Sequence, residues 1–462
     1  MQLIEYPKGV KDEVTIMNLD RALMNGAIVT PFGRFKGSIG IKEGKIACVA
    51  ENTAELHAKE TIDVEGKFII PGAIDTHIHF QDPGRTHRED FEHATAACAF
   101  GGITTGIAMP ANNLVDVERY NFNTQTYEGR GYIDYALHGA GRPTNVDKIE
   151  DLWTQTGITA IKMFMTYESR VDDATIWEIL ETLSQHNGIS IIHAENETLI
   201  KLFEHRLQKQ GRKDPMAHNE SRPELVEIEA IRRVAYLVEQ TNSRAVIAHV
   251  SSAAGLEEIK KAQNRGVKIW SESCPHFFTF VREDTKKLGP FLAFTPVMRG
   301  EDNRLKMWEL LEKGYVDTIG SDHCPAERWE KEVALDDIWK THYGIPGLEV
   351  YLPSLLDGVN KGLVSLERVV AATSYNAAQI YGLYPRKGVI QPGADADLVV
   401  LDMDLERTFT EADLKSKCPW SPYFGRTFKG WPVLTLVRGE VVAKDGNIVG
   451  KLGHGQLVTR NK

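Results

Sequence analysis

The stretch FIIPGAIDTHIHF at residues 68–80 decides the fold class of this 462-residue chain, because it opens a series of short apolar segments with strand character. The segments are rich in β-branched and small residues, and most end in polar or glycine-rich sequence. They lie at residues 68–80, 102–110, 132–141, 158–165, 189–195, 244–252, 267–275 and 316–323. Eight strands alternating with helices are the number that closes a (β/α)8 TIM barrel, so the series predicts an α/β protein with this fold.

Amphipathic segments between these strands, such as 172–186 and 224–240, have the pattern of helices. In the second segment the expected buried face consists of Leu225, Ile228, Ile231, Val234 and Leu237. An open, doubly wound sheet would also alternate strands and helices. That fold usually carries a glycine-rich phosphate-binding turn after its first strand, and the sequence has none, so the barrel is favoured.

The two ends of the chain have a different pattern, that of short strands joined by turns. Residues 13–66 carry turn signals at Asn25-Gly26, Pro31-Phe32-Gly33 and Glu43-Gly44, and residues 386–455 carry one at Asp445-Gly446-Asn447. Neither end is long enough to form a good two-sheet core alone, so we expect one small β-sandwich built from both termini. The expected domains are 1–67 and 385–462 for the two parts of the sandwich and 68–384 for the barrel.

Composition restricts the function classes. Lys and Arg number 54 against 64 Asp and Glu, which gives a formal net charge of −10 and no basic field for nucleic acid or an anionic membrane. The chain has no apolar run of membrane-spanning length. Its five scattered cysteines form no CxxC motif and indicate reduced thiols in the cytoplasm. We therefore expect a cytoplasmic enzyme of a small molecule, with no nucleic acid or membrane as partner.

The first predicted strand ends in the pair His77 and His79, whose side chains share one face of an extended strand and can reach one metal ion. With 15 histidines in the chain, such a pair also arises by chance. Three further candidate ligands end other predicted strands: His193, His249 and Asp322. The carboxyl ends of barrel strands surround one opening, so these positions together predict a metal site. Other histidines, His342 among them, are expected to be structural or exposed.

Lys162 lies inside the very apolar fourth predicted strand, where an unpaired ammonium is unfavourable. One interpretation is a lysine that extends to the surface or pairs with a carboxylate. The other is carbamylation by carbon dioxide, which requires the neutral amine and converts a cation into a carboxylate-like bridge. Two metal ions about 3.5–4 Å apart could share such a bridge.

Six motifs in combination identify the chain as a member of the amidohydrolase superfamily: PGAIDTHIH, AIKMFMTY, IIHAENE, IAHVSS, ESCPH and TIGSDHCP. The resemblance covers nearly the whole chain, from Gly26 to about Gly455, and is to the cyclic amidohydrolases. This group comprises hydantoinases, dihydropyrimidinases, allantoinases and dihydroorotases. The resemblance implies a hydrolase that opens a cyclic amide or ureide ring and assembles as a homodimer or homotetramer.

The resemblance also implies a binuclear metal centre. It assigns His77, His79 and Asp322 to one ion, His193 and His249 to the second, and a carboxylated Lys162 to both. Zinc is the expected metal because imidazole and carboxylate suit it, with manganese and iron as alternatives. Asp322 would carry the proton from the attacking water to the leaving nitrogen. Tyr167 matches the tyrosine that stabilises the oxyanion in hydantoinases, an ordinary rim residue being the alternative.

The substrate signals are mixed. Dihydroorotases carry an arginine two residues after the HxH pair, where this chain has Gln81, although Arg85 follows closely. The segment DPGRTH at 82–87 resembles allantoinases, whereas MFMTY, HAENE and the C-terminal half resemble hydantoinases and dihydropyrimidinases. A hydantoin or a dihydropyrimidine is therefore the first expectation, allantoin the second and dihydroorotate the third.

Two segments are expected to contact the substrate. Hydantoinases hold imide atoms through backbone groups near a Ser-Pro-Pro and an Asn-Gly segment, and Thr295-Pro296-Val297 and Tyr343-Gly344 stand at those places. Thr295, Tyr343 and Tyr167 are therefore the candidate substrate-binding residues. Phe80 and Phe164 could flank an apolar ring substituent or belong to the core. A non-catalytic dihydropyrimidinase-like scaffold is the alternative from another class, and it is disfavoured because all six ligand positions are filled.

Overall fold

A computed structural model describes residues 18–51, 56–110 and 113–461 of the chain. It contains the predicted barrel, whose third strand is interrupted at His138 so that its two parts pair with different neighbours. The barrel strands are β6 (Ala73–Ile78), β7 (Ile103–Ala108), β8 (Asp134–Leu137) with β9 (Gly139–Ala140), β10 (Ile161–Phe164), β11 (Ser190–His193), β12 (Ala245–Ile247), β13 (Ile269–Ser273) and β14 (Thr318–Ile319). All pairings within it are parallel, and a bridge between Ile78 and His323 closes the ring.

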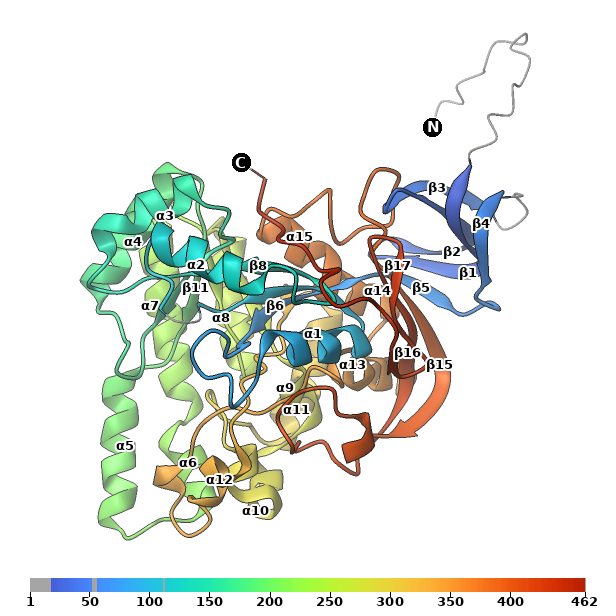
Figure 1. Cartoon of the computed structure of the whole chain (residues 1–462). Coiled ribbons are helices and arrows are strands. Elements are labelled where there is room, and N and C mark those ends of the chain that lie inside the picture. Colours follow the sequence, from blue (N-terminus) through green and yellow to red (C-terminus); the bar gives the residue numbers. More distant parts are fainter. Residues whose placement is uncertain (1–17, 52–55, 111–112, 462) are drawn as a thin grey trace.

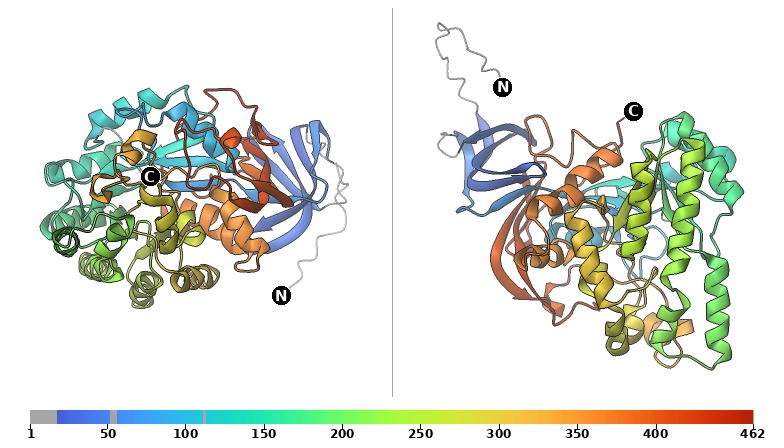
Figure 2. Two further views of the ribbon diagram at one scale, coloured as in Figure 1. Left: turned by 90° about the horizontal axis from the view of Figure 1, so that it is seen from below. Right: turned by 180° about the vertical axis from the view of Figure 1, so that it is seen from behind.

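Helices surround the barrel, and the terminal sheet packs at one side of it (Figure 2). The helices are α1 (Phe91–Phe100), α2 (Val117–Tyr127), α3 (Ile149–Gln155), α4 (Asp173–Gln185), α5 (Glu197–Lys209), α6 (Pro215–Ser221), α7 (Glu224–Thr241), α8 (Ala253–Asn264), α9 (Pro275–Thr279), α10 (Thr285–Leu288), α11 (Glu301–Glu312), α12 (Arg328–Glu332), α13 (Tyr351–Asn360), α14 (Leu366–Val370) and α15 (Asn376–Ile380). Side-chain caps from Asp90, Asp172 and Ser252 begin α1, α4 and α8.

Helices inserted after β11, β13 and β14 build up one end of the barrel. Of these, α5, α6, α10 and α12 project from that end, whereas α15 and the C-terminus lie at the other (Figure 1). The insertions follow the carboxyl ends of the strands, where barrel enzymes carry their active sites. They therefore surround the side chains that the sequence singles out.

The helix predicted at 224–240 is present, but the predicted burial of one residue on it, Leu225, is wrong. Leu225 is 47% exposed, and the buried stripe instead runs through Val226, Ala230, Val234 and Val238. These four residues are spaced by four, so they lie above one another on the side that packs against the barrel.

Residues 68–80, expected as a single barrel strand, form two strands in different sheets. β5 (Phe68–Pro71) belongs to the terminal sheet, and β6 starts the barrel after Gly72. A Cβ on Gly72 would clash with the side chain of Thr104 on β7, so only glycine lets the chain pass so closely from one sheet to the other.

Strands from both termini join in one nine-stranded sheet, which confirms that the two ends of the chain form a single β-domain. The strands are β1 (Leu19–Thr30), β2 (Gly33–Lys42), β3 (Lys45–Glu51), β4 (Ala58–Asp63), β5, β15 (Leu398–Thr408), β16 (Thr427–Val437), β17 (Glu440–Lys444) and β18 (Asn447–Ile448). β5 pairs with β1 on one side and with β15 on the other. The buried core contains Ile28 and Ile69 from one end and Leu398 and Leu436 from the other.

Three of the four predicted turns connect strands as expected, at Phe32-Gly33, at Glu43-Gly44 and after Asp445. Asn25-Gly26 does not, because it lies inside β1 at a register shift against β2. Asn25 has a φ of 59°, so the left-handed conformation that suggested a turn serves a β-bulge here. Residues 13–17 of the predicted N-terminal segment lie outside the described residues. Among the helices described, none is long and apolar enough to cross a membrane.

A buried ion cluster joins the barrel to the terminal sheet. Lys387 is 1% exposed, and its ammonium lies 2.5 Å from Asp134 of β8, 2.6 Å from Asp397 and 3.0 Å from Asp395. Asp134 also pairs with Arg438, which follows β16. The three carboxylates are close enough to hold a cation together, and Lys387 supplies that positive charge.

Replacing Lys387 with Met should therefore destabilise the protein by about 3–5 kcal/mol, because three buried carboxylates would lose their shared cation. The free energy of unfolding from urea titration is the measurement. Lys361→Met is the matched control, since Lys361 is exposed and pairs with a single carboxylate, Asp357, worth at most about 1 kcal/mol. Equal stability of the two variants would contradict the role of Lys387.

Candidate metal centre

The candidate ligands come from distant parts of the chain and meet at the carboxyl end of the barrel. His77 and His193 lie in β6 and β11, His249 follows β12, and Asp322 follows β14. With His79 they line one cavity of about 450 Å³. Closure of the barrel therefore brings five of the six candidate side chains to one opening, and Lys162 of β10 lies buried beside them.

The atoms that could bind metal lie close together. Asp322 Oδ1 is 3.4 Å from His77 Nε2 and 3.3 Å from His79 Nε2, while His193 Nδ1 is 3.0 Å from His249 Nε2. Ligand atoms of His77, His249 and Asp322 all lie within 4.8 Å of one another. His249 and Asp322 have φ values of 39° and 45°, a rarely occupied backbone conformation that directs their side chains inward.

Lys162 is fully buried, and its Nζ has no hydrogen-bond partner among the described residues. The amine lies 4.7 Å from the centre of the Phe164 ring. Burial lowers the pKa of Lys162 to about 8, although Asp322 and Glu272 oppose this by attracting the charged form. A larger fraction of Lys162 is therefore neutral near pH 7 than of an exposed lysine. A neutral amine with no hydrogen-bond partner among the described residues is what reaction with carbon dioxide requires, and the carboxylate formed could bind divalent cations.

Two buried carboxylates bind one ring nitrogen each of His77 and His193 and so orient these rings. Glu272 Oε1 is 2.6 Å from His77 Nδ1, and Glu195 Oε2 is 2.8 Å from His193 Nε2. Each imidazole thus uses one nitrogen for a carboxylate and directs the other toward the remaining candidate ligands, as metal-binding histidines do. Arg222 in turn donates to Glu195 at 2.7 Å. Burial raises the pKa of Glu195, but Arg222 and His193 outweigh it and hold that pKa at about 2.

Glu195 and Glu272 are functional residues that the sequence reasoning missed. Both lie inside motifs of the sequence analysis, HAENE and ESCPH. The available signal was a carboxylate at the end of a predicted barrel strand. The donor set as a whole, with free imidazole nitrogens, one aspartate and an unpartnered amine, fits a pair of divalent cations.

The three predicted substrate-binding residues all line the cavity: Tyr167, Thr295 and Tyr343. The hydroxyl groups of Tyr167 and Thr295 are in hydrogen-bond contact. Burial raises the pKa of Tyr167, so its hydroxyl stays protonated and can donate a hydrogen bond. Tyr343 stacks on His218, with ring centres 4.7 Å apart and planes 15° apart.

The remaining wall is aromatic on one part and polar on another. Phe164 and Phe294 line the cavity, whereas Phe80 packs in the core against Phe91, 5.0 Å between ring centres. His342 also lines it, and its Nε2 lies 2.8 Å from the Arg88 guanidinium, a contact that agrees with the expected structural histidine. Arg85 lines the cavity as well, and its guanidinium forms no ion pair with a described residue.

Comparison with known proteins agrees with this geometry. The model of the Amidohydrolase family matches residues 68–442. The chain is 35% identical to an L-hydantoinase of Paenarthrobacter aurescens over 450 residues, which covers 96% of this chain and 98% of the relative. It is 33% identical to a D-hydantoinase of Geobacillus stearothermophilus (96% and 97% covered) and to an allantoinase of Deinococcus radiodurans (94% and 97% covered).

Solved structures give the same result. The L-hydantoinase (dihydropyrimidinase) from Arthrobacter aurescens superimposes with a TM-score of 0.93 at 35% identity, covering 96% of this chain and all of that one. A dihydropyrimidinase from Brevibacillus agri superimposes with a TM-score of 0.90 at 28% identity, covering 96% and 98%. These matches confirm the (β/α)8 barrel with a β-sandwich domain.

Glu272→Gln should weaken metal binding by about 10- to 100-fold, because His77 would lose the carboxylate that orients its ring. Competition with a chromogenic chelator measures the affinity for zinc. Glu309→Gln is the control, since Glu309 is exposed on α11 and pairs only with lysines. Unchanged zinc affinity in Glu272→Gln, with wild-type circular dichroism, would show that this carboxylate does not support the centre.

Proposed function

The chain belongs to the amidohydrolase family, and from that premise we propose that it is a metal-dependent cyclic amidohydrolase whose substrate is a hydantoin or a dihydropyrimidine. One observation carries the proposal: five candidate ligands line one cavity of about 450 Å³, and beside them lies a buried lysine whose amine has no hydrogen-bond partner among the described residues. A cavity of that size suits a five- or six-membered ring with a substituent. Similarity to hydantoinases over nearly the full length supports the same reaction.

The proposed centre holds two divalent ions, preferably Zn²⁺. The proposed ligands are His77, His79 and Asp322 for one ion, His193 and His249 for the other, and N6-carboxylated Lys162 for both. Ions held by these residues would supply an activated water and polarise the substrate carbonyl. The imidazole nitrogens left free by Glu195 and Glu272 support this assignment.

Asp322 is the proposed proton carrier. Its carboxylate is mostly buried and lies at the centre of the site, 3.3 Å from His79 Nε2. From there it can accept a proton from the attacking water and return it to the ring nitrogen that leaves. One group serving both steps leaves the site with the same protonation before and after turnover.

Tyr167 is the proposed oxyanion donor. Its buried hydroxyl can donate to the carbonyl oxygen as negative charge develops there, which is worth about 3 kcal/mol for one donor. Thr295, in contact with that hydroxyl, fixes its direction. Phe164 and Phe294 exclude water from the ring and flank its substituent.

The segments at Thr295 and Tyr343 are the proposed backbone contacts to the substrate. Gly344 has a φ of 116°, and a Cβ there would clash with Cys324. The peptide after Tyr343 therefore packs tightly against the segment that follows Asp322, which holds its polar groups at the cavity wall.

Allantoin is the second candidate substrate, and Arg85 favours it. Arg85 comes from the allantoinase-like segment, lines the cavity and leaves its guanidinium without an ion pair among the described side chains. Allantoin differs from simple hydantoins by a ureido substituent, whose carbonyl oxygen can accept hydrogen bonds from that guanidinium.

The proposal also includes the cellular location and the oligomeric state of the enzyme. A cytoplasmic location is supported by the five cysteines, none of which forms a disulfide. Assembly as a homodimer or homotetramer rests on the resemblance to cyclic amidohydrolases.

A substrate panel tests the reaction. The zinc-loaded protein should release an N-carbamoyl amino acid from a hydantoin, detected by colorimetry, and a chelator should abolish turnover. Dihydrouracil, allantoin and dihydroorotate complete the panel and rank the substrate classes. Lys162→Ala should abolish activity, with partial rescue by a short carboxylic acid, whereas Lys361→Ala should not. Inactivity of the metal-loaded protein on every ring would make the proposed substrate class wrong and leave the metal site intact, whereas a protein that binds no metal in metal-replete medium would favour the non-catalytic scaffold.

Tyr167→Phe should lower kcat by about a hundredfold and change KM little, because the hydroxyl acts on charge that develops only in the transition state. Steady-state kinetics on the best substrate of the panel provides both constants. Tyr236→Phe, on the exposed surface of α7, is the control. A near-normal kcat in Tyr167→Phe would assign this residue to the cavity wall alone.

A further inference from the structure

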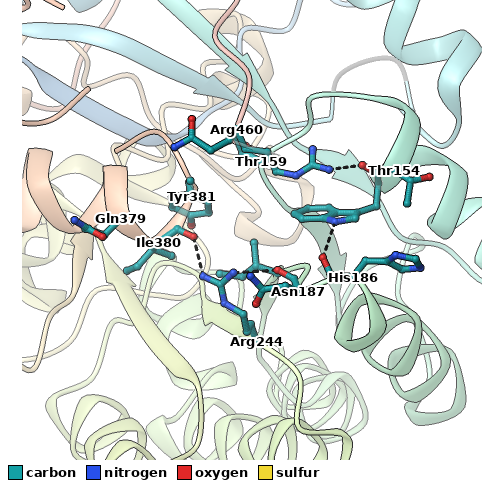
Figure 3. A pocket seen from close by; sticks show the side chains of 13 residues that line it. Thr154, Thr159, His186, Asn187, Arg244, Gln379, Ile380, Tyr381 and Arg460 are labelled. Atoms are coloured by element: carbon teal, nitrogen blue, oxygen red, sulfur yellow. Dashed lines mark hydrogen bonds between the residues drawn. The ribbon is translucent and has the colours of Figure 1, made fainter. Parts of the chain in front are cut away.

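Figure 3 shows the residues that line a second cavity, of about 520 Å³. This cavity lies at the end of the barrel opposite the candidate metal centre. Thr159, Ile189 and Arg244 line it, and they precede β10, β11 and β12, so the cavity faces the amino ends of these strands. Its other wall comes from the C-terminal part of the chain, including Tyr381 and Arg460. The catalytic proposal does not use this cavity.

The cavity is positively charged. Arg244 and Arg460 both line it, and none of the described lining residues carries a carboxylate. Neither guanidinium forms an ion pair with a described residue, although both are only partly exposed. Glu150 approaches the rim, 3.1 Å from His186, but it is 63% exposed and pairs with that histidine. Two like charges thus share a partly desolvated space without an anion to balance them.

Both guanidinium groups are held in place by neutral contacts. Arg244 donates to the carbonyl oxygens of Asn187 at 3.0 Å and Ile380 at 3.3 Å. Arg460 donates to the carbonyl oxygens of Ile158 at 2.8 Å, Thr156 at 3.0 Å and Trp153, and it stacks over the Trp153 ring at 3.8 Å. These contacts fix the planes of the guanidinium groups but leave their charge uncompensated.

The free donors suit an oxyanion. A guanidinium has five N–H donors, and backbone oxygens take two from Arg244 and three from Arg460, so each group keeps at least two donors for a ligand. The side-chain amides of Asn187 and Gln379 also line the cavity and form no hydrogen bond with a described residue. A planar carboxylate or a phosphate matches such a set, because charged N–H···O contacts to it are short and strong.

We propose that this cavity binds a small metabolite through a carboxylate or phosphate group held by Arg244 and Arg460. The volume is in the range of small-molecule sites. Asn461, next to Arg460, donates its backbone N–H to Gly382 at 2.8 Å, so the C-terminal segment already lies on the barrel. An anion joining Arg460 to Arg244 stabilises this docking and, by linkage, the folded protein.

Inorganic phosphate and succinate are the probes for the two oxyanion types. The zinc-loaded wild type should show a saturable rise in melting temperature with at least one of them, at ionic strength held constant with sodium chloride. Isothermal titration gives the affinity. Arg244→Gln and Arg460→Gln should each weaken it at least tenfold, whereas Arg244→Lys, which keeps the charge, should weaken it less.

Arg206→Gln removes an exposed arginine of α5 that forms no ion pair with a described residue, and this variant should bind the probe as the wild type does. Affinity is compared rather than melting temperature alone, because Arg244 and Arg460 also bind backbone oxygens. The proposal is overturned if neither probe binds saturably. It is also overturned if Arg244→Gln and Arg460→Gln keep wild-type affinity, or if binding disappears only when zinc is removed, which would place the anion at the metal centre.

Discussion

Closure of the barrel between β6 and the segment after β14 is the constraint on which the site depends. The backbone N–H of His79 donates to the carbonyl oxygen of His323 at 2.9 Å, and the N–H of Ser321 donates to Asp75 at 2.8 Å. These two contacts join the first and last barrel strands at their carboxyl ends. They bring Asp322 to 3.3 Å from His79, although the two residues lie far apart in the sequence. The metal centre is thus a product of the ring closing, rather than of any single motif.

Burial then determines how these groups behave. In water the amine of Lys162 and the carboxyl group of Glu272 would both be charged at neutral pH, whereas burial moves the pKa of each to about 8. Unpaired buried charge is unfavourable, so such a cluster is stabilised when its members compensate one another and when bound cations balance its carboxylates. The same principle explains Lys387, which is surrounded by three carboxylates and needs no metal. One buried lysine links the barrel to the terminal sheet, and the other lies beside the candidate metal ligands without a hydrogen-bond partner among the described residues.

Much of the architecture could be predicted, because barrel strands and the ligands at their ends are visible as short local patterns in the sequence. Strand-ending residues such as His193 need only the strand to be placed correctly, and the ring then brings them together. The rest depends on contacts between distant segments. Asn25-Gly26 has the same backbone preference in a bulge as in a turn, and residues 68–80 are apolar on both sides of Gly72. Glu272 and His342 reach the site only through tertiary packing, which local periodicity does not report.

The position of β5 between β1 and β15 has a consequence for synthesis on the ribosome. The nascent N-terminal strands can pair among themselves early, but the outer edge of β5 stays open until residues 398–401 emerge, after the whole barrel has been synthesised. During that interval the growing polypeptide presents an unpaired apolar edge of the kind that recruits chaperones or templates aggregation. Truncation products that stop before β15 would retain this edge permanently.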